Sequence, residues 1–147
     1  MVEADTLMRT LAVTARAVSR DLTQAIEPEG LFGAEWAILA LLHRGGPVSQ
    51  AALAAAMALE PPAISKALAR LESRSWIRRS PGPTRREHRV ALTPEAELCF
   101  ARWEDAVTIH HARALDGFSP AEIDTLYALL SRLRANLRPA EESIATP

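Results

Sequence analysis

Residues 61–94, PPAISKALARLESRSWIRRSPGPTRREHRVALTP, contain the pattern that decides the fold of this chain of 147 residues. A proline at position 61 suits the start of a helix, because the first helical N–H has no partner inside the helix. Apolar residues then recur at the spacing of one helix face: Ile64, Ala67, Leu68 and Leu71. Before this helix, Ser49 is a favourable N-cap for a short helix that ends at about Met57. The sequence therefore predicts two short helices in succession.

The pattern changes after the second of these helices. Residues 76–80 and 88–92 favour two short strands, and residues 81–84, PGPT, are typical of a turn. Arg85 and Arg86 follow directly on this turn. The sequence thus predicts a β-hairpin with a basic tip after two short helices, which is the order of elements in a winged helix-turn-helix.

Helices are predicted on both sides of this unit, so the expected fold class is mainly α with a small β-hairpin. A stripe of apolar residues predicts an amphipathic helix over 5–26, and another helix is expected over 34–43. Residues 93–95, TPE, predict the start of a long helix that runs to about 117. Residues 119–122, SPAE, form a capping box that begins the last helix.

The two ends of the chain predict a homodimer. Apolar residues of the last helix repeat at spacings of three and four: Ile123, Leu126, Leu130, Leu133 and Leu137. Such a narrow seam suits packing between helices, and a small monomer can hardly bury apolar stripes at both of its ends. We expect one domain in which 5–30 and 94–138 form dimerisation helices, 34–93 form the winged lobe and 139–147 form a flexible tail.

Charge is unevenly distributed along the sequence. The formal net charge is −1, yet residues 61–89 contain eight basic and two acidic residues. A nearly neutral protein with one basic third can bind nucleic acid there. The second short helix is narrow enough for the major groove, and the hairpin can reach the neighbouring backbone or minor groove. We therefore expect binding to double-stranded DNA.

The expected DNA contacts lie on the two short helices and at the hairpin tip: Ser49, Pro62, Ser65, Lys66, Arg70, Arg85 and Arg86. Hydroxyl and cationic side chains on the second helix can bind phosphates or base edges, and unpaired N–H groups at its N-terminus suit a phosphate. Arginines at the tip suit a narrow, electronegative minor groove. Solvated side chains are the preferred interpretation for three other arginines: Arg74, Arg78 and Arg79.

Two segments resemble the MarR family of bacterial winged-helix transcriptional regulators. Residues 60–72, EPPAISKALARLE, resemble its recognition helix, and residues 84–94, TRREHRVALTP, are similar to its wing. The flanking helices extend the resemblance over nearly the whole chain. The resemblance implies a ligand-responsive dimeric repressor on a pseudo-palindromic operator, with Arg86 in the minor groove and the helix residues named above facing the DNA.

The chain departs from this family at four positions. Thr84 stands where the wing has an aspartate, which removes an ion pair that often braces the hairpin. Ser75 and Ala96 stand where glycines are usual, and Trp76 replaces a leucine. Ser75 is expected to be strained if its position requires a positive φ.

The resemblance also implies a small effector, often a phenolic or other lipophilic anion, held between the dimerisation helices and the winged lobe. Arg16, Trp36 and His43 are the candidate lining, because a cation beside an aromatic ring can hold such an anion. A core position for Trp36 and an exposed or satisfied position for His43 are the preferred alternatives.

Other classes of function have weaker support. Cys99 is interpreted as a buried thiol. His110 and His111, with His43, Glu104 or Asp105, could supply metal ligands, but adjacent histidines point about 100° apart on a helix and chelate poorly as a pair. A redox- or metal-responsive regulator stays an alternative. The sequence lacks a Gly-rich phosphate loop and a Gly-x-Ser-x-Gly motif, so we expect neither an enzyme nor a cofactor. It also lacks a signal peptide and a long apolar run, which favours a cytoplasmic protein without membrane attachment. A winged helix that binds only protein is the remaining alternative, and the basic tip argues against it.

Overall fold

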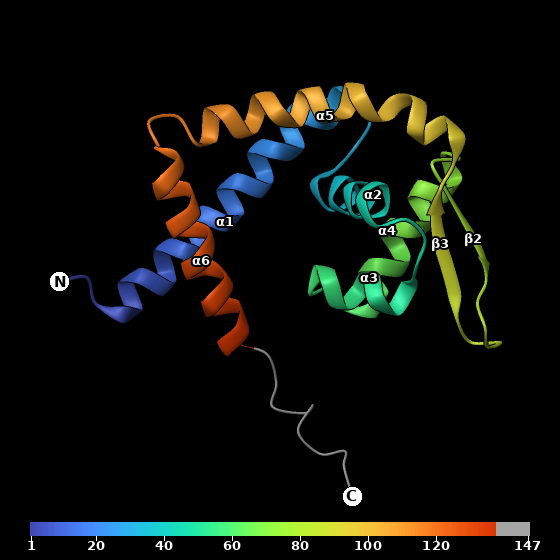
Figure 1. The fold of residues 1–147 in the computed structure, drawn as a ribbon, viewed down its shortest axis with the longest axis horizontal. Helices are drawn as coiled ribbons and strands as arrows, with labels where there is room; N and C mark the ends of the chain where they lie inside the picture. The colour runs from blue at the N-terminus through green and yellow to red at the C-terminus, as the bar shows by residue number, and fades with distance from the viewer. Residues whose placement is uncertain (138–147) are drawn as a thin grey trace, which may run out of the picture. The chain divides into compact units, whose positions relative to one another are not determined.

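The computed structural model of the chain describes residues 1–137. Within this range the chain forms helices, strands and one short 3-10 helix (Figure 1): α1 (Ala4–Ile26), η1 (Glu27–Glu29), α2 (Gly33–Gly45), β1 (Val48–Ser49), α3 (Gln50–Met57), α4 (Pro61–Ser73), β2 (Ile77–Pro81), β3 (His88–Leu92), α5 (Pro94–Ala114) and α6 (Pro120–Asn136). The predicted class, mainly α with a small β-hairpin, is confirmed. The flexible tail predicted at 139–147 lies outside the described residues.

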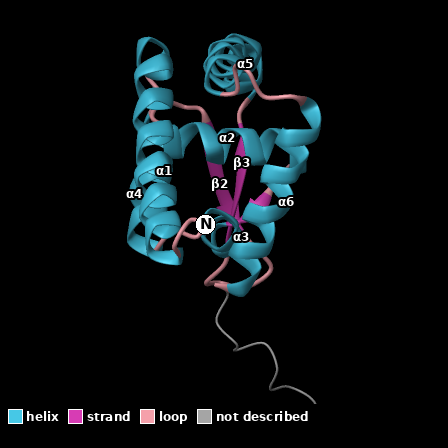
Figure 2. Cartoon of the chain, turned by 90° about the vertical axis from the view of Figure 1, so that its left-hand side faces the viewer, coloured by secondary structure: helices cyan, strands magenta, loops and turns pink. Residues whose placement is uncertain are grey.

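The predicted hairpin is part of a three-stranded antiparallel sheet of order β1-β3-β2 (Figure 2). Strands β2 and β3 pair from Ile77 opposite Leu92 to the tip. The sequence analysis missed β1, whose Val48 pairs with Val90. Two residues carry no alternation that could predict a strand, so only the partner strand identifies it.

The described chain divides into two compact units, one ending at His111 and one beginning at Ala112. The first unit contains a core drawn from α1, α2, α3, α4, the sheet and α5: Ile26, Leu31, Ile38, Leu39, Leu53, Ile64, Leu68, Leu71, Val90, Ala96 and Trp103 are all fully buried. The second unit contains the end of α5 and α6, and α6 has no buried residue.

Side-chain caps fix the starts of three helices where the sequence predicted them. The Ser49 hydroxyl accepts from the N–H three residues further on at 3.1 Å and begins α3. Thr93 does the same at 3.2 Å for α5, and Ser119 forms a capping box with Glu122 for α6. Each cap satisfies an N–H that the helix leaves unpaired, so these boundaries follow from local chemistry.

Two non-glycine residues adopt left-handed backbone after the short helices. Ala58 ends α3 with φ of 49°, and Ser75 follows α4 with φ of 59°. The position of Ser75 therefore does require the positive φ that the sequence analysis considered. The turn at Ser75 directs the next residue, Trp76, against Trp103, with ring centroids 4.7 Å apart.

Large apolar side chains stay exposed on the two terminal helices. They are Leu7, Met8, Val13 and Val18 on α1, and Leu126, Tyr127, Leu129 and Leu130 on α6. None of the helices in the described part of the chain is long and apolar enough to cross a membrane.

Candidate nucleic-acid interface

Helix α4 has one buried face and one exposed face. Ile64, Leu68 and Leu71 are fully buried in the lobe, whereas Pro62, Ser65 and Lys66 are among the exposed residues on its other side. The burial of a few apolar side chains on one stripe fixes how the helix is rotated about its axis. The N-terminal half of α4 therefore presents an exposed stripe of polar and basic groups.

The N-terminus of α4 does not offer the free N–H groups that the sequence analysis expected for a phosphate. The first two helical residues are both prolines, which lack an N–H. The N–H groups of Ala63 and Ile64 both donate to the Glu60 carbonyl, at 3.0 and 3.2 Å. This expectation was wrong, and side chains must bind any phosphate at this end of the helix.

A groove lies between the hairpin, α3 and the start of α4. Its volume is about 290 Å³, and its lining includes Ser49 and Gln50 from the start of α3, Ile64 from α4 and Arg86 from the hairpin. Gln50 donates from Nε2 to Ser65 Oγ at 3.0 Å and so joins the two short helices on their exposed side. The sequence analysis missed Gln50, because its role depends on a partner 15 residues away; its place beside the Ser49 cap was the only available signal.

The hydroxyl of Ser49 is used within the fold, since it caps α3. Ser49 and Arg86, two of the expected DNA contacts, both line the groove. The hydroxyl of Ser65 accepts the Gln50 hydrogen bond and keeps its own proton available for donation.

Four of the eight basic residues in 61–89 are engaged, that is, they have a hydrogen-bond or ion-pair partner within the lobe. Arg79 donates from Nε to Glu72 at 2.9 Å, and this bond lowers the pKa of the Glu72 carboxyl and raises the pKa of the guanidinium. Arg89 donates to the Pro47 carbonyl at 2.9 Å, and Arg74 donates to the carbonyl of Gly30.

Arg70 is the fourth engaged cation. Its Nε lies 3.1 Å from Oε1 of the buried Glu35, and its guanidinium lies 4.2 Å from the centre of the Phe32 ring. The structure therefore separates Arg70 from the other expected DNA contacts, because its guanidinium already has a partner in α2.

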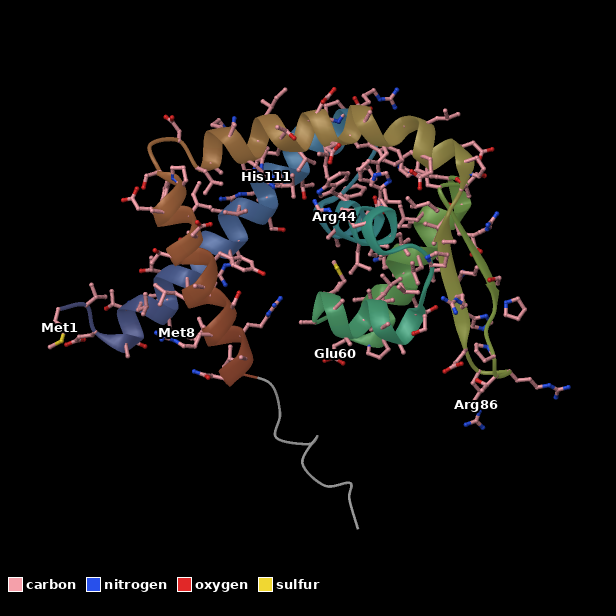
Figure 3. The ribbon with its side chains drawn as sticks, viewed as in Figure 1. Met1, Met8, Arg44, Glu60, Arg86 and His111 are labelled. Carbon is pink, nitrogen blue, oxygen red and sulfur yellow. The ribbon has the colours of Figure 1, made fainter. Side chains whose placement is uncertain are left out.

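The other four basic residues form no hydrogen bond or ion pair within the described chain: Lys66, Arg78, Arg85 and Arg86. All four are exposed, and Arg86 lies at the far end of the hairpin (Figure 3). We call these four residues the free cations. Unpaired guanidinium and ammonium groups on one lobe are the chemistry that binds a phosphate backbone.

Two of the three candidate effector residues, Trp36 and His43, pack on the same ring, that of Phe100, whereas within the described chain Arg16 forms no hydrogen bond or ion pair with either. Arg16 is exposed on α1, and His43 pairs through Nδ1 with Glu97 at 2.8 Å while its ring stacks on Phe100 at 3.7 Å. Trp36 is buried, as the alternative interpretation had it, and its ring lies 5.2 Å from that of Phe100.

Of these three candidates, only Trp36 lines a second groove, of about 580 Å³. Ala37, Ala40 and Leu41 of α2 continue its apolar wall, and Arg44 and His111 supply its polar groups (Figure 3). Burial, and then the charges of His110 and Arg44, lower the pKa of His111. Arg44 was not predicted from the sequence, and His111 was considered only as a metal ligand; the two approach each other because α2 packs beside α5.

The residues considered for sensing take other places. Cys99 is half-buried. His110 is buried, and its Nε2 lies 3.1 Å from Oδ2 of Asp21 on α1. Within residues 1–137, no three side chains of the metal-binding types gather into a site.

Comparison with known proteins agrees with this architecture. Residues 33–87 match the sequence model of the MarR family. The uncharacterised HTH-type transcriptional regulator YwoH of Bacillus subtilis (strain 168) is 32% identical over 91 residues, which are 62% of this chain and 66% of YwoH, slightly under two thirds of its length.

Two solved structures share the fold. Sco3205, a MarR family transcriptional regulator from Streptomyces coelicolor solved in complex with DNA, superposes with a TM-score of 0.86 at 21% identity over 100% of this chain and 97% of its own. BpsR of Bordetella bronchiseptica, whose DNA binding is regulated by 6-hydroxynicotinic acid, superposes with a TM-score of 0.79 at 22% identity over 87% and 98% of the two chains.

Proposed function

Because this chain belongs to the MarR family of transcriptional regulators, we propose that it binds double-stranded DNA sequence-specifically as a homodimer and represses transcription until an effector weakens that binding. One observation carries this proposal. The free cations and the exposed face of α4 belong to the same winged lobe, while the other arginines of that segment hold the lobe together.

The geometry of the lobe supports different DNA contacts for helix α4 and for the hairpin. Helix α4 enters the major groove, where Ser65 and Lys66 contact base edges or phosphates. Arg85 and Arg86 reach the adjacent minor groove from the hairpin tip, and Arg78 contacts the backbone from the outer strand. Side chains do all of this work, because the prolines at the start of α4 leave it without free N–H groups.

The exposed apolar residues support the homodimer. Helix α6 buries none of its residues, and four large apolar side chains are exposed on it. Burying such a stripe against a second copy is favourable by about 25 cal/mol per Å² of apolar surface removed from water. A two-fold dimer carries two winged lobes, so its operator is expected to be a pseudo-palindrome.

The groove beside Trp36 supports an effector site for a small lipophilic anion. An indole and three aliphatic side chains form its wall, and Arg44 supplies a positive charge at its edge. Trp36 therefore stays an effector candidate, and we assign to Arg44 the role of binding the anion that the sequence suggested for Arg16. An apolar pocket with one charged group is the usual design of a site for a drug-sized ligand.

Selection from a random pool of duplexes tests the function. The wild-type protein should enrich a pseudo-palindrome and bind it tightly, measured by the anisotropy of a labelled duplex at several salt concentrations. Aromatic carboxylates added to that complex should then release the duplex, and Arg44→Ala should abolish their effect while leaving DNA affinity intact. Binding that stays in the micromolar range for every duplex would contradict a sequence-specific regulator.

A further inference from the structure

The second half of α4 is tied to the connection between α1 and α2. Glu35, in the first turn of α2, is buried, with only 3% of its side chain exposed. One of its oxygens accepts the N–H of Phe32 at 3.1 Å, and the other pairs with Arg70 at 3.1 Å. The Glu35 carboxylate therefore accepts a hydrogen bond at the start of α2 and also forms an ion pair with α4.

Arg70 is held on two sides. Its Nε pairs with Glu35, and the plane of its guanidinium lies over the Phe32 ring. Guanidinium groups favour such a combination of a carboxylate and an aromatic face. If Arg70 turned outward to a phosphate, the buried Glu35 carboxylate would lose this cation, and a buried unpaired charge is strongly unfavourable.

Four residues after Arg70, at the C-cap of α4, Arg74 makes a second attachment to the same connection. It donates to the carbonyl of Gly30, which has φ of +75°, and its guanidinium lies 5.0 Å from the centre of the Trp76 ring. This left-handed backbone at position 30 is one that residues with a side chain rarely adopt, so glycine suits the position.

These contacts divide one row of α4 into two parts. Lys66 and Arg70 lie on one stripe of the helix, and Arg74, which directly follows its last residue, continues their spacing of four. The first is free, and the other two are bound to residues 30–35. The N-terminal half of the helix is thus available for DNA, and the C-terminal half is anchored.

We propose that Glu35 and Arg70 are positioning residues, which hold the C-terminal half of α4 against the start of α2 in the rotation that its buried apolar face sets, and so help to decide which of its side chains meet the bases. Arg70 then contributes to sequence discrimination without contacting DNA, contrary to the expectation from sequence. This inference rests on the proposed function, because it concerns the orientation of the helix that reads the operator.

The test compares Arg70→Gln, Glu35→Gln and their double variant with Lys66→Gln, all as full-length protein. Each is measured on the selected operator and on an unrelated duplex of equal length. We expect Arg70→Gln and Glu35→Gln each to weaken operator binding about 10-fold and the double variant to be no worse than either, since the pair acts as one unit. Binding to the unrelated duplex and the salt dependence should not change.

Lys66→Gln should behave differently. It should weaken binding to both duplexes and lower the slope of log K against log salt by about 2, because a dimer loses two phosphate contacts. The same fall in slope for Arg70→Gln would show that Arg70 touches phosphates and would overturn the inference. Unchanged operator affinity in Glu35→Gln would overturn it as well.

Folding is controlled by circular dichroism. If Arg70→Gln does not fold, Phe32→Leu removes the aromatic face at an exposed position, keeps the ion pair and should reduce operator preference to a smaller extent. Operator preference equal to that of the wild type in this variant then overturns the inference. A wild-type protein that selects no duplex overturns the proposed function and the inference together, whereas normal selection with unaffected variants overturns the inference alone.

Discussion

Replacing Arg86 with alanine should lower the salt dependence of DNA binding, whereas replacing Arg79 of the same hairpin should not. Arg86 has no partner among the described residues and lies at the hairpin tip. Arg79 is already bound to Glu72, so it has no free charge to exchange for the counterions of DNA. Both variants remove a guanidinium from the same hairpin, one that is engaged with Glu72 and one that is free.

The magnitude follows from the number of free cations. A homodimer carries two sets of four, and each neutralised phosphate contributes about 0.9 to the slope of log K against log salt, so the upper limit is about −7. Losing Arg86 from both subunits brings this limit to about −5. Between 50 and 200 mM salt, affinity should fall by about 20,000-fold for the wild type and about 2,000-fold for the variant. At fixed salt, Arg86→Ala should cost about 1–3 kcal/mol.

The assay is a titration of a labelled operator at four salt concentrations, read by anisotropy, with both variants checked for folding. A wild-type slope in Arg86→Ala would contradict the binding of phosphates by Arg86. If Arg79→Ala lowers the slope as much as Arg86→Ala does, engaged cations contribute to DNA binding as free ones do, which would also contradict the prediction.

Three further results are expected. Ser75→Gly should raise stability by about 1 kcal/mol and the melting temperature by about 3 °C, because glycine relieves the left-handed backbone, whereas Ser73→Gly inside α4 should lower it; equal effects would contradict the strain. Leu130→Lys should shift the sedimentation equilibrium toward monomer, and an unchanged dimer mass would exclude α6 from the interface. Because Arg79 depresses the pKa of Glu72, the pair stabilises the fold above the usual carboxyl pKa of 4.5 and loses that contribution as the pH falls through the lower folded value. Acid unfolding below pH 4.5 should therefore be steeper in the wild type than in Glu72→Gln, and identical profiles would count against this linkage.

Features that depend on neighbouring residues were predictable from the sequence. The Ser49 and Ser119 caps, the proline start of α4 and the hairpin all follow from residues within a few positions of one another. Hydrophobic periodicity also identified the buried face of α4, because a spacing of three and four places residues on one side of a helix.

The roles of the arginines were not predictable in this way. Arg70 pairs with a residue 35 positions earlier, and Arg74 binds a carbonyl 44 positions earlier. A sequence shows how many cations a segment contains, but tertiary packing decides which of them remain free. The proposed effector groove has the same origin, since Arg44 and His111 belong to helices that are far apart in the chain.

The placement of the tryptophans provides intrinsic fluorescence reporters of the proposed effector groove and of the anchored end of α4. The chain contains three: Trp36 lines the effector groove, and Trp76 packs on Trp103 beneath Arg74, at the anchored end of α4. Trp36→Phe leaves an emission spectrum that reports only on the anchor, and Trp76→Phe leaves one dominated by the groove and the core. Quenching by an aromatic effector and reorientation of the recognition helix can thus be followed as separate signals in unlabelled protein, and the order in which they appear gives the sequence of steps in the response.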